Sequence, residues 1–139
     1  MEFSNVKQVL GLKEPIRSPY DLINLGGRGI SKSAVARLAR HLSIGLPEMA
    51  PLLSVTLRTI QRYSAEKVFS RAVSERVLRI ALVVARGEKV FGGRERFNVW
   101  LKEPNAALKE KRPIELLGSD FGIDLILDEL GRIEHGIVS

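Results

Sequence analysis

Apolar residues recur at helical spacing along most of this chain, and the pattern predicts a protein built of helices. Ser31 is placed to cap a helix that continues to about Leu42, and Gly45 is placed to end it. The buried stripe of that helix is Val35, Leu38, Ala39 and Leu42. The segment 70–86 is apolar over more than one face, as expected of a helix buried between other helices. Since no segment keeps the alternating period of a half-buried strand, we expect an all-α fold.

Residues 46–63, with the sequence LPEMAPLLSVTLRTIQRY, carry the pattern of two short helices joined by a tight turn. The small Ala50 lies where the neighbouring helix must cross closely. The other apolar positions flank the turn or return after it at helical spacing: Leu53, Val55, Leu57 and Ile60. This arrangement is typical of a helix-turn-helix, whose second helix enters the major groove of DNA.

The second helix of this unit places polar side chains away from its apolar face. Thr56 is a good N-cap, so the helix begins where a groove-entering N-terminus should. Guanidinium groups suit guanine, an amide suits adenine, and a hydroxyl suits a phosphate or a base edge. The residues expected to bind DNA are Thr56, Arg58, Thr59, Gln61 and Arg62. The alternative is a plain helical hairpin with a solvated Arg and Gln face.

Two residues depart from the usual helix-turn-helix pattern. Ser54 stands at the turn position that often holds glycine. Pro51 lies inside the first helix, where it removes a backbone hydrogen bond at a cost of roughly 3 kcal/mol unless the helix is bent there. Pro51 therefore bears on the tilt of the DNA-reading unit and on whether DNA binding is retained.

Residues 1–29 carry weaker signals. Two short apolar groups, at 6–10 and 20–23, are interrupted by prolines and by the GGRG at 26–29. We interpret this segment as an irregular, variable N-terminal arm that lies on the body or helps to pair two subunits. Its glycines follow no strand and fit neither common phosphate-loop spacing, which favours a flexible connector.

Three further helical segments are predicted after residue 86. Two glycines at 92–93 break the chain, and the next helix places Phe97, Trp100 and Leu101 on one face, with Trp100 expected in the core. Pro113 opens a short helix, because proline is favoured in a first turn, and Ser119 caps the last helix. The buried stripe of that helix is Ile123, Ile126, Leu127, Leu130 and Ile133.

Charge is divided unevenly along the chain, whose net charge is +6 over 139 residues. Residues 1–63 hold nine Lys and Arg against four Asp and Glu, and residues 64–112 hold twelve against six. Residues 113–139 hold one against six. A basic body suits a polyanion such as DNA, whereas an acidic end is repelled by DNA and suits a basic partner. We therefore expect the two ends to meet different partners.

The composition excludes several classes of protein. A hydrophobic content of 45% with 27% charged residues is that of a folded chain of one domain or two small ones. No window approaches the ~18 apolar residues that span a bilayer, and the N-terminus lacks a signal-peptide core. With no cysteine there is no disulfide, thiolate metal site or cysteine nucleophile, and a reducing cytoplasm is compatible. His41 has no second ligand type nearby, so we expect no metal and no cofactor.

Six motifs follow one another between Gly29 and Ser139: ISKSAVARLARHL, LSVTLRTIQRYS, KVFGG, WLKEPNAAL, RPIELL and LGRIEHG. In this order and spacing the chain resembles the Xre/MbcA/ParS-type antitoxins, which join an Xre-like helix-turn-helix to a C-terminal toxin-binding domain. The resemblance covers about four-fifths of the chain and leaves out the N-terminal arm. One departure is that Lys109 and Glu110 stand where glycines are common after the PNxAL element.

The resemblance implies a cytoplasmic type II antitoxin whose partner is a RES-domain toxin that consumes NAD or transfers ADP-ribose. In such systems the C-terminal domain covers the active-site cleft of the toxin, and the helix-turn-helix represses the shared operon. Residues 30–69 would then form the DNA-binding region and residues 70–139 the toxin-binding domain. The implied toxin contacts are Arg132, Ile133, Glu134, His135, Gly136 and Ile137, with Glu134 pairing with toxin cations and Arg132 making polar contacts.

Other functions remain open at the level of sequence. The nearest alternative is a stand-alone helix-turn-helix transcriptional repressor without a toxin partner. An enzyme is disfavoured, because the adjacent Glu134 and His135 point in different directions on a helix and no nucleophile or phosphate loop lies near. An RNA-binding adaptor is disfavoured by the few aromatic residues. Since DNA half-sites are usually read by paired subunits, we expect at least a homodimer.

Overall fold

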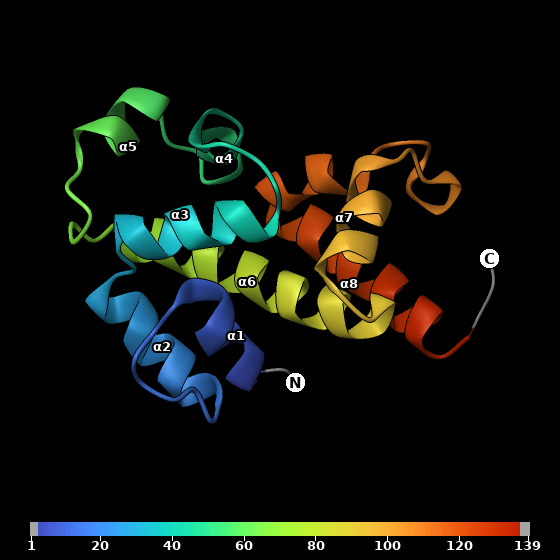
Figure 1. Ribbon diagram of the computed structural model, residues 1–139, viewed down its shortest axis with the longest axis horizontal. Helices are drawn as coiled ribbons and strands as arrows, with labels where there is room; N and C mark the ends of the chain where they lie inside the picture. The colour runs from blue at the N-terminus through green and yellow to red at the C-terminus, as the bar shows by residue number, and fades with distance from the viewer. Residues whose placement is uncertain (1–2, 137–139) are drawn as a thin grey trace.

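A long central helix, α6 (Arg71–Phe91), organises the protein, and helices from both halves of the chain pack along it (Figure 1). The computed structural model describes residues 3–136. Around α6 the chain forms α1 (Phe3–Leu10), α2 (Pro19–Arg28), α3 (Lys32–His41), α4 (Leu46–Leu52), α5 (Leu57–Arg62), α7 (Arg94–Lys102), two 3-10 helices η1 (Ala106–Leu108) and η2 (Pro113–Gly118), and α8 (Asp120–Glu134). Over the described residues β-structure is limited to two isolated bridges. The expected all-α fold is confirmed.

The burial of α6 follows from its sequence. Ser70 caps it by accepting a hydrogen bond from the Val73 amide, and Gly92 ends it in a left-handed conformation with φ 78°. Helices α1, α2, α3, α7 and α8 all contact it. Its buried apolar residues, which cover several faces, include Val77, Leu78, Ile80, Ala81, Val83 and Val84. The hydrophobic segment is therefore the shared core of the two halves, as its pattern predicts.

The N-terminal segment differs from the irregular arm expected from sequence. It forms α1 and α2, which pack against α6, and α1 also contacts α3. Three apolar residues of α1 are fully buried: Val6, Val9 and Leu10. Helices this short are stabilised by packing more than by their own propensity, so the local pattern alone was a weak signal.

The glycines of GGRG also differ from the flexible connector expected. Gly26 and Gly27 lie inside α2, and a Cβ at Gly26 would stand 3.0 Å from the Glu75 side chain on α6. At Gly29, with φ 92°, a Cβ would stand 2.8 Å from the Phe69 carbonyl oxygen. Glycine at 26 and 29 therefore allows close approach of this segment to the body.

Helix α3 has the predicted cap and stripe but a different end. The Ser31 hydroxyl accepts from the Ala34 amide, and the stripe residues are buried. The helix ends at His41, and the chain turns through Ser43, whose φ is 53°. Gly45 does not end α3; it is the N-cap of α4, where its amide donates to the Glu48 carboxylate at 2.6 Å. The expectation for Gly45 was wrong because the four residues 42–45 separate the two helices, and Gly45 is the last of them.

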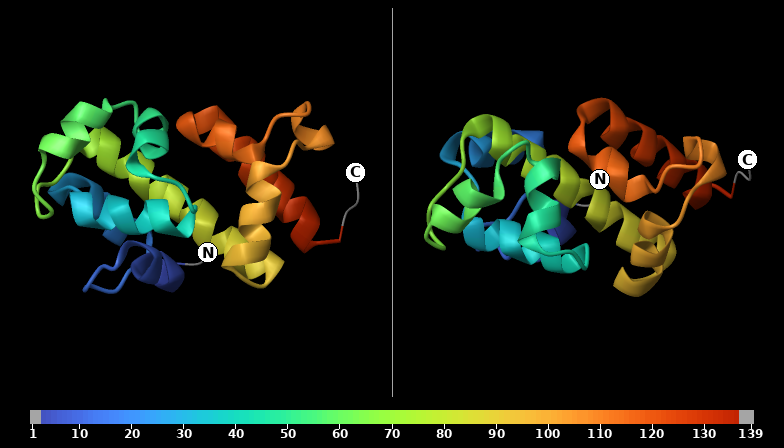
Figure 2. Two further views of the ribbon diagram at one scale, coloured as in Figure 1. Left: turned by 45° about the horizontal axis from the view of Figure 1, so that its top comes forward. Right: turned by 90° about the horizontal axis from the view of Figure 1, so that it is seen from above.

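The C-terminal elements also pack on α6, with α8 along much of its length and α7 near its C-terminal end (Figure 2). Gly87 of α6 faces the ring of Phe97 on α7 so closely that no Cβ would fit between them. Trp100 is half-buried against Phe91 and Phe97, with ring centroids 5.5 and 6.0 Å away, so it lies at the edge of the core. Lys109 has a positive φ of 57°, and Glu110 follows with 62°. The loop thus keeps the conformation that glycine favours, although the residues differ.

Helix α8 begins as predicted. The Ser119 hydroxyl accepts from the Gly122 amide at 3.0 Å, and Ile123, Ile126 and Leu130 are fully buried. Pro113 opens η2, a 3-10 helix that packs on α8. Helix α5 and the C-terminal end of α8 lie at opposite ends of the molecule (Figures 1 and 2).

Among residues 3–136, the helices are all too short or too polar to cross a bilayer.

Candidate functional site

The predicted DNA-reading helix is a short exposed helix, α5, that is held on the body by one buried residue. Ile60 is fully buried, and Leu57 is half-buried beside it. Arg58, Gln61 and Arg62 are exposed to solvent. The helix-turn-helix is therefore present with its apolar side inward, and these three side chains are available to a partner.

The two threonines of α5 are partly engaged with each other. Thr56 accepts from the Thr59 amide at 3.1 Å, which confirms it as the N-cap. Its hydroxyl also lies 2.9 Å from the hydroxyl of Thr59, which is half-buried. Each hydroxyl can still accept or donate one further hydrogen bond, so a phosphate at the start of α5 remains compatible with this geometry.

The turn before α5 resolves both departures seen in the sequence. Ser54 has a φ of 56°, the left-handed conformation for which glycine is common at this position. Pro51 lies one residue before the end of α4, where the helix is already closing: the amides of Leu53 and Val55 both donate to the Ala50 carbonyl, at 3.1 and 3.2 Å. The proline is therefore accommodated in the last turn of α4.

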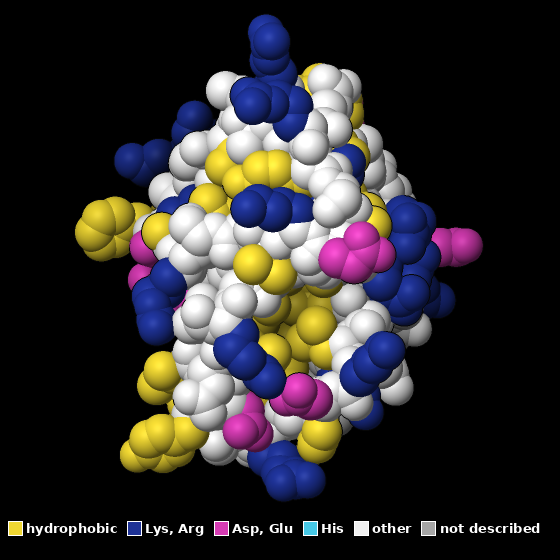
Figure 3. Space-filling model, turned by 90° about the vertical axis from the view of Figure 1, so that its left-hand side faces the viewer, with side chains coloured by type: hydrophobic (Ala, Val, Ile, Leu, Met, Phe, Trp, Pro, Cys, Tyr) yellow, Lys and Arg dark blue, Asp and Glu magenta, His cyan; other side chains and the backbone are white. Residues whose placement is uncertain are grey.

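The end of α5 is tied to neighbouring elements. Lys32 of α3 donates to the Tyr63 carbonyl at 2.9 Å, and the ring of Tyr63 packs on Phe69 with centroids 4.9 Å apart. The ammonium of Lys67 stands 5.6 Å from the Tyr63 ring centroid. A positive charge at a helix C-terminus is favourable, so Lys32 both holds and stabilises this end. Figure 3 shows Lys and Arg side chains standing at the top of this face of the molecule.

The acidic C-terminal segment is largely neutralised within the chain, which the uneven charge had not indicated. Arg79 of α6 donates to Asp124 at 2.7 Å and lies 3.8 Å from Asp120, and Arg86 donates to Glu134 at 3.0 Å. The carboxylates at 113–139 that have ion-pair partners are Glu115, Asp120, Asp124, Glu129 and Glu134. The acidic end that was expected to suit a basic partner is therefore largely paired within the chain, because arginines of α6 face the carboxylates of α8.

The predicted toxin contacts lie in and after the last turn of α8. Glu134, His135 and Gly136 are exposed, while Arg132 and Ile133 are half-buried. The guanidinium of Arg132 lies 3.7 Å from the buried Glu129, whose Oε2 has no hydrogen-bond partner within residues 3–136. Ile137, also predicted as a contact, lies outside the described residues. The described members of the predicted set thus lie together in the last turn of α8 and just after it, three of them exposed.

Arg76 joins the helix-turn-helix half to the C-terminal half, a role that the sequence pattern did not indicate. It donates to the carbonyls of Leu52, at the end of α4, and Gly118, at the end of η2. It also lies 3.4 Å from Asp120. Its side chain is only 19% exposed. The one available signal was an arginine inside a helix that is apolar over several faces.

His41 has a structural environment at the junction of three helices. Arg94 of α7 approaches Nε2 at 3.3 Å, and Glu88 of α6 approaches Nδ1 at 2.9 Å. A guanidinium only donates, so Nε2 accepts from Arg94, and Nδ1–H can donate to the Glu88 carboxylate. Asn98 donates to the His41 backbone carbonyl at 2.8 Å. Over the residues that the structure describes, no group of three or more His, Cys, Asp and Glu side chains is arranged to hold a metal.

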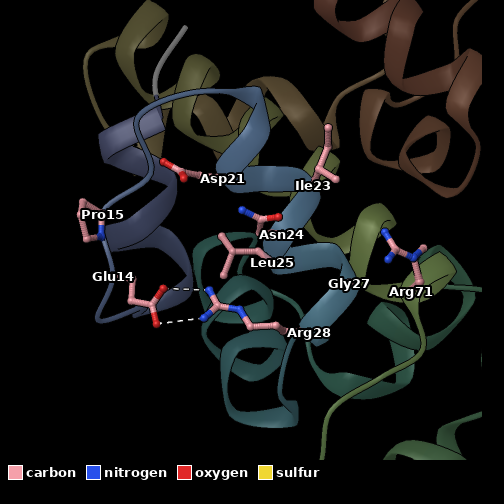
Figure 4. A pocket seen from close by; sticks show the side chains of 9 residues that line it. All are labelled: Glu14, Pro15, Asp21, Ile23, Asn24, Leu25, Gly27, Arg28 and Arg71. Carbon is pink, nitrogen blue, oxygen red and sulfur yellow. Dashed lines mark hydrogen bonds and ion pairs between the residues drawn. The ribbon is translucent and has the colours of Figure 1, made fainter.

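A hollow of about 470 Å³ lies beside α2, away from the predicted site residues (Figure 4). At its edge Arg28 donates twice to Glu14, at 3.1 and 2.8 Å, and Arg71 stands on the other side. The hydrogen bonds from Arg28 lower the pKa of the Glu14 carboxyl, and the same pair raises the pKa of Arg28. The pair is mostly exposed, and its role is to tie the loop before α2 to the end of that helix.

Two family models match consecutive parts of the chain. Residues 21–82 match the antitoxin Xre-like helix-turn-helix domain, and residues 86–136 match the antitoxin Xre/MbcA/ParS C-terminal toxin-binding domain. The first match begins inside α2, so the similarity extends further toward the N-terminus than the sequence motifs indicated. The boundary between the two matches falls within α6, the helix that both halves share.

Curated relatives and a solved structure agree with these matches. The protein named antitoxin Xre of Photorhabdus laumondii is 26% identical over 113 residues, which are 80% of this chain and 76% of that protein. A Sphingobium protein named Prs ADP-ribosylating antitoxin is 28% identical over 129 residues, 86% of this chain and 81% of the other. The crystal structure of the M. tuberculosis MbcT-MbcA toxin-antitoxin complex contains a chain of the same fold, with a TM-score of 0.58 and 19% identity, over 78% of this chain and 96% of that one.

Proposed function

Because the chain belongs to the antitoxins that join an Xre-like helix-turn-helix to an Xre/MbcA/ParS C-terminal toxin-binding domain, we propose that it neutralises a RES-type toxin by covering the toxin's active site. The antitoxin of a toxin-antitoxin system acts by binding, and the proposal assigns the chain no catalytic step and no cofactor. The partner would consume NAD or transfer ADP-ribose. One relative has ADP-ribosylation in its name, which supports this class of partner.

The observation that carries the proposal is the separation of the two exposed surfaces. The end of α8, with Arg132, Glu134 and His135, and the outer side of α5 lie at opposite ends of the molecule (Figure 1). A toxin on the end of α8 therefore leaves α5 accessible. We place the active-site contact at residues 132–137, within and just beyond the segment matched to the toxin-binding domain.

The DNA-binding part of the proposal concerns α5. Thr56, Arg58, Thr59, Gln61 and Arg62 would bind the operator of the antitoxin's own operon, and the bound protein would repress it. The exposed side chains of α5 and the match of residues 21–82 to a helix-turn-helix domain support this assignment. Reading two half-sites requires at least a homodimer, which would bind toxin in a larger complex.

A titration tests the inhibitory function directly. The full chain is added to the toxin encoded by the neighbouring gene, and loss of NAD is followed. Inhibition of NAD loss should become complete near a fixed molar ratio of antitoxin to toxin. The double variant Arg132→Ala, His135→Ala should inhibit less than the wild type at equal concentration. The proposal is abandoned if the wild-type chain leaves NAD consumption unchanged. If it binds only its operator, the chain is a stand-alone repressor.

A further inference from the structure

Helix α8 carries two large apolar side chains that the fold leaves in solvent. Phe121 is 86% exposed and Leu125 is 50% exposed. They are four residues apart, so they lie next to each other on one face of the helix. The buried side of α8 is formed by other residues, chiefly Ile123, Ile126 and Leu130. Phe121 and Leu125 are therefore not part of the core. Adjacent exposed apolar residues of this size indicate a contact surface.

Asp128 extends this pair into a row along the helix. It follows Leu125 by three residues, so it stands on the same face, and it is exposed. Within residues 3–136 its carboxylate has no ion pair or hydrogen bond, whereas the carboxylates of Asp124 and Glu134 are held by arginines of α6. Asp128 therefore offers an unpaired negative charge beside two apolar side chains. We call Phe121, Leu125 and Asp128 the outer row of α8.

We propose that the outer row is the surface on which the toxin docks, in a contact separate from the active-site contact at residues 132–137. The fitting partner surface has an apolar pocket for Phe121 and Leu125 and a Lys or Arg beside it for Asp128. This inference rests on the proposed function, since it assumes a toxin partner. In this arrangement the outer row supplies much of the binding energy, because buried aromatic anchors dominate interfaces, and the end of α8 blocks the active site.

Two observations favour the toxin over other occupants. The outer row lies in the segment matched to the toxin-binding domain, and one turn of α8 separates Asp128 from Arg132 at the proposed active-site contact. A second copy of the chain fits less well, because self-pairing around Phe121 and Leu125 would bring like carboxylates together. DNA is disfavoured by the same negative charge.

The test measures toxin affinity and inhibition separately. Purified full-length variants Phe121→Ala, Leu125→Ala and Asp128→Lys are titrated into the toxin of the neighbouring gene by calorimetry, and NAD loss is followed in parallel. The two apolar truncations should each weaken binding by about 10-fold or more, as for residues central to an interface. At antitoxin concentrations that saturate the toxin, they should still inhibit fully. Asp128→Lys should also weaken binding to the toxin, and this loss of affinity should become smaller as the salt concentration rises.

Control variants keep the interpretation unambiguous. Tyr20→Ala removes another exposed aromatic side chain, 77% exposed on α2, and should bind toxin like the wild type. Thermal unfolding and operator binding show whether the variants are folded. Because Phe121 and Leu125 are exposed, replacing them should leave the fold intact.

The outcomes separate this inference from the proposed function. If the wild-type chain binds and inhibits the toxin but the outer-row variants bind equally well, the docking surface is refuted and the proposed function stands. The same conclusion follows if Tyr20→Ala loses as much affinity, or if the outer-row variants change only the antitoxin's own oligomeric state. If the wild-type chain does not bind the toxin, both proposals fail.

Discussion

Arg86 in α6 and Glu134 at the end of α8 form an ion pair, with a guanidinium nitrogen 3.0 Å from the carboxylate. Glu134 is the residue assigned to pair with toxin cations, and within the chain it already has a partner. Both side chains are 36% exposed, so the pair can open at small cost. A toxin cation would therefore compete with Arg86 for the same carboxylate.

The competition predicts that Arg86→Ala strengthens toxin binding. Removing the internal partner leaves Glu134 free to pair, and the gain should be a few-fold, since exposed ion pairs contribute about 0–1 kcal/mol. Calorimetric titration of the toxin measures it. Adding Glu134→Gln to the same chain should remove the gain. Equal affinities of Arg86→Ala and the wild type would mean that Glu134 makes no ionic contact with the toxin.

Arg58→Ala and Arg62→Ala should each weaken operator binding about 10-fold or more, because each removes an exposed cation from α5. The slope of log affinity against log salt concentration should also fall by about one for each arginine that contacts a phosphate. Mobility shifts at several salt concentrations measure both effects. Toxin inhibition should not change, and Arg96→Ala on α7 is the matched control for loss of charge. Joint loss of both activities in a folded protein would contradict the assignment of separate surfaces.

Arg76→Met should destabilise the protein by about 1–3 kcal/mol, because it leaves the carbonyls of Leu52 and Gly118 without their donor at the junction of the two halves. Methionine keeps most of the side-chain volume, so loss of packing is a minor part of the effect. Urea denaturation measures the free energy of unfolding. Arg79→Met, which breaks more exposed pairs with Asp120 and Asp124, should cost less than about 1 kcal/mol. Equal losses for the two variants would show that Arg76 has no special structural role.

The pKa of the Glu115 carboxyl lies below its ordinary value of 4.5, chiefly because it accepts a hydrogen bond from the Arg112 amide at the start of η2. A carboxyl whose pKa is depressed by folding stabilises the native state above its unfolded pKa, and the contribution is lost as pH falls through the folded value. Glu115→Gln should therefore lower the unfolding temperature at neutral pH, and its difference from the wild type should vanish as the pH falls through the depressed pKa. Thermal scans from pH 3 to 7 on both proteins measure the difference. A difference independent of pH would exclude the charge as its source.

The elements that sequence predicted well are those specified by neighbouring residues. Ser31, Thr56 and Ser119 each cap the helix that follows, and the stripe of α3 is buried as expected. In the stripe of α8, Ile123, Ile126 and Leu130 are buried, whereas Leu127 and Ile133 are half-buried. Capping and periodicity depend on residues within one or two turns, so they can be read from the chain alone. The tight turn between α4 and α5 also lies where the sequence predicts it, whereas the left-handed conformation of Ser54 is seen only in the structure.

Tertiary structure decided what depends on residues far apart in the chain. Helix α1 packs on α6 and α3, which cover Val6 and Leu10, and the local sequence of this segment does not indicate that contact. The carboxylates of the acidic C-terminal segment are largely paired within the chain. Arg79 and Arg86 lie opposite Asp124 and Glu134 only when α8 packs on α6, so the sequence alone does not show these pairs. For the same reason Phe121, one apolar residue among many in the sequence, is distinguished by its exposure only in the folded chain. Helical periodicity in the sequence predicts which side of a helix is apolar, whereas tertiary packing determines which apolar side chains stay exposed and can contact a partner.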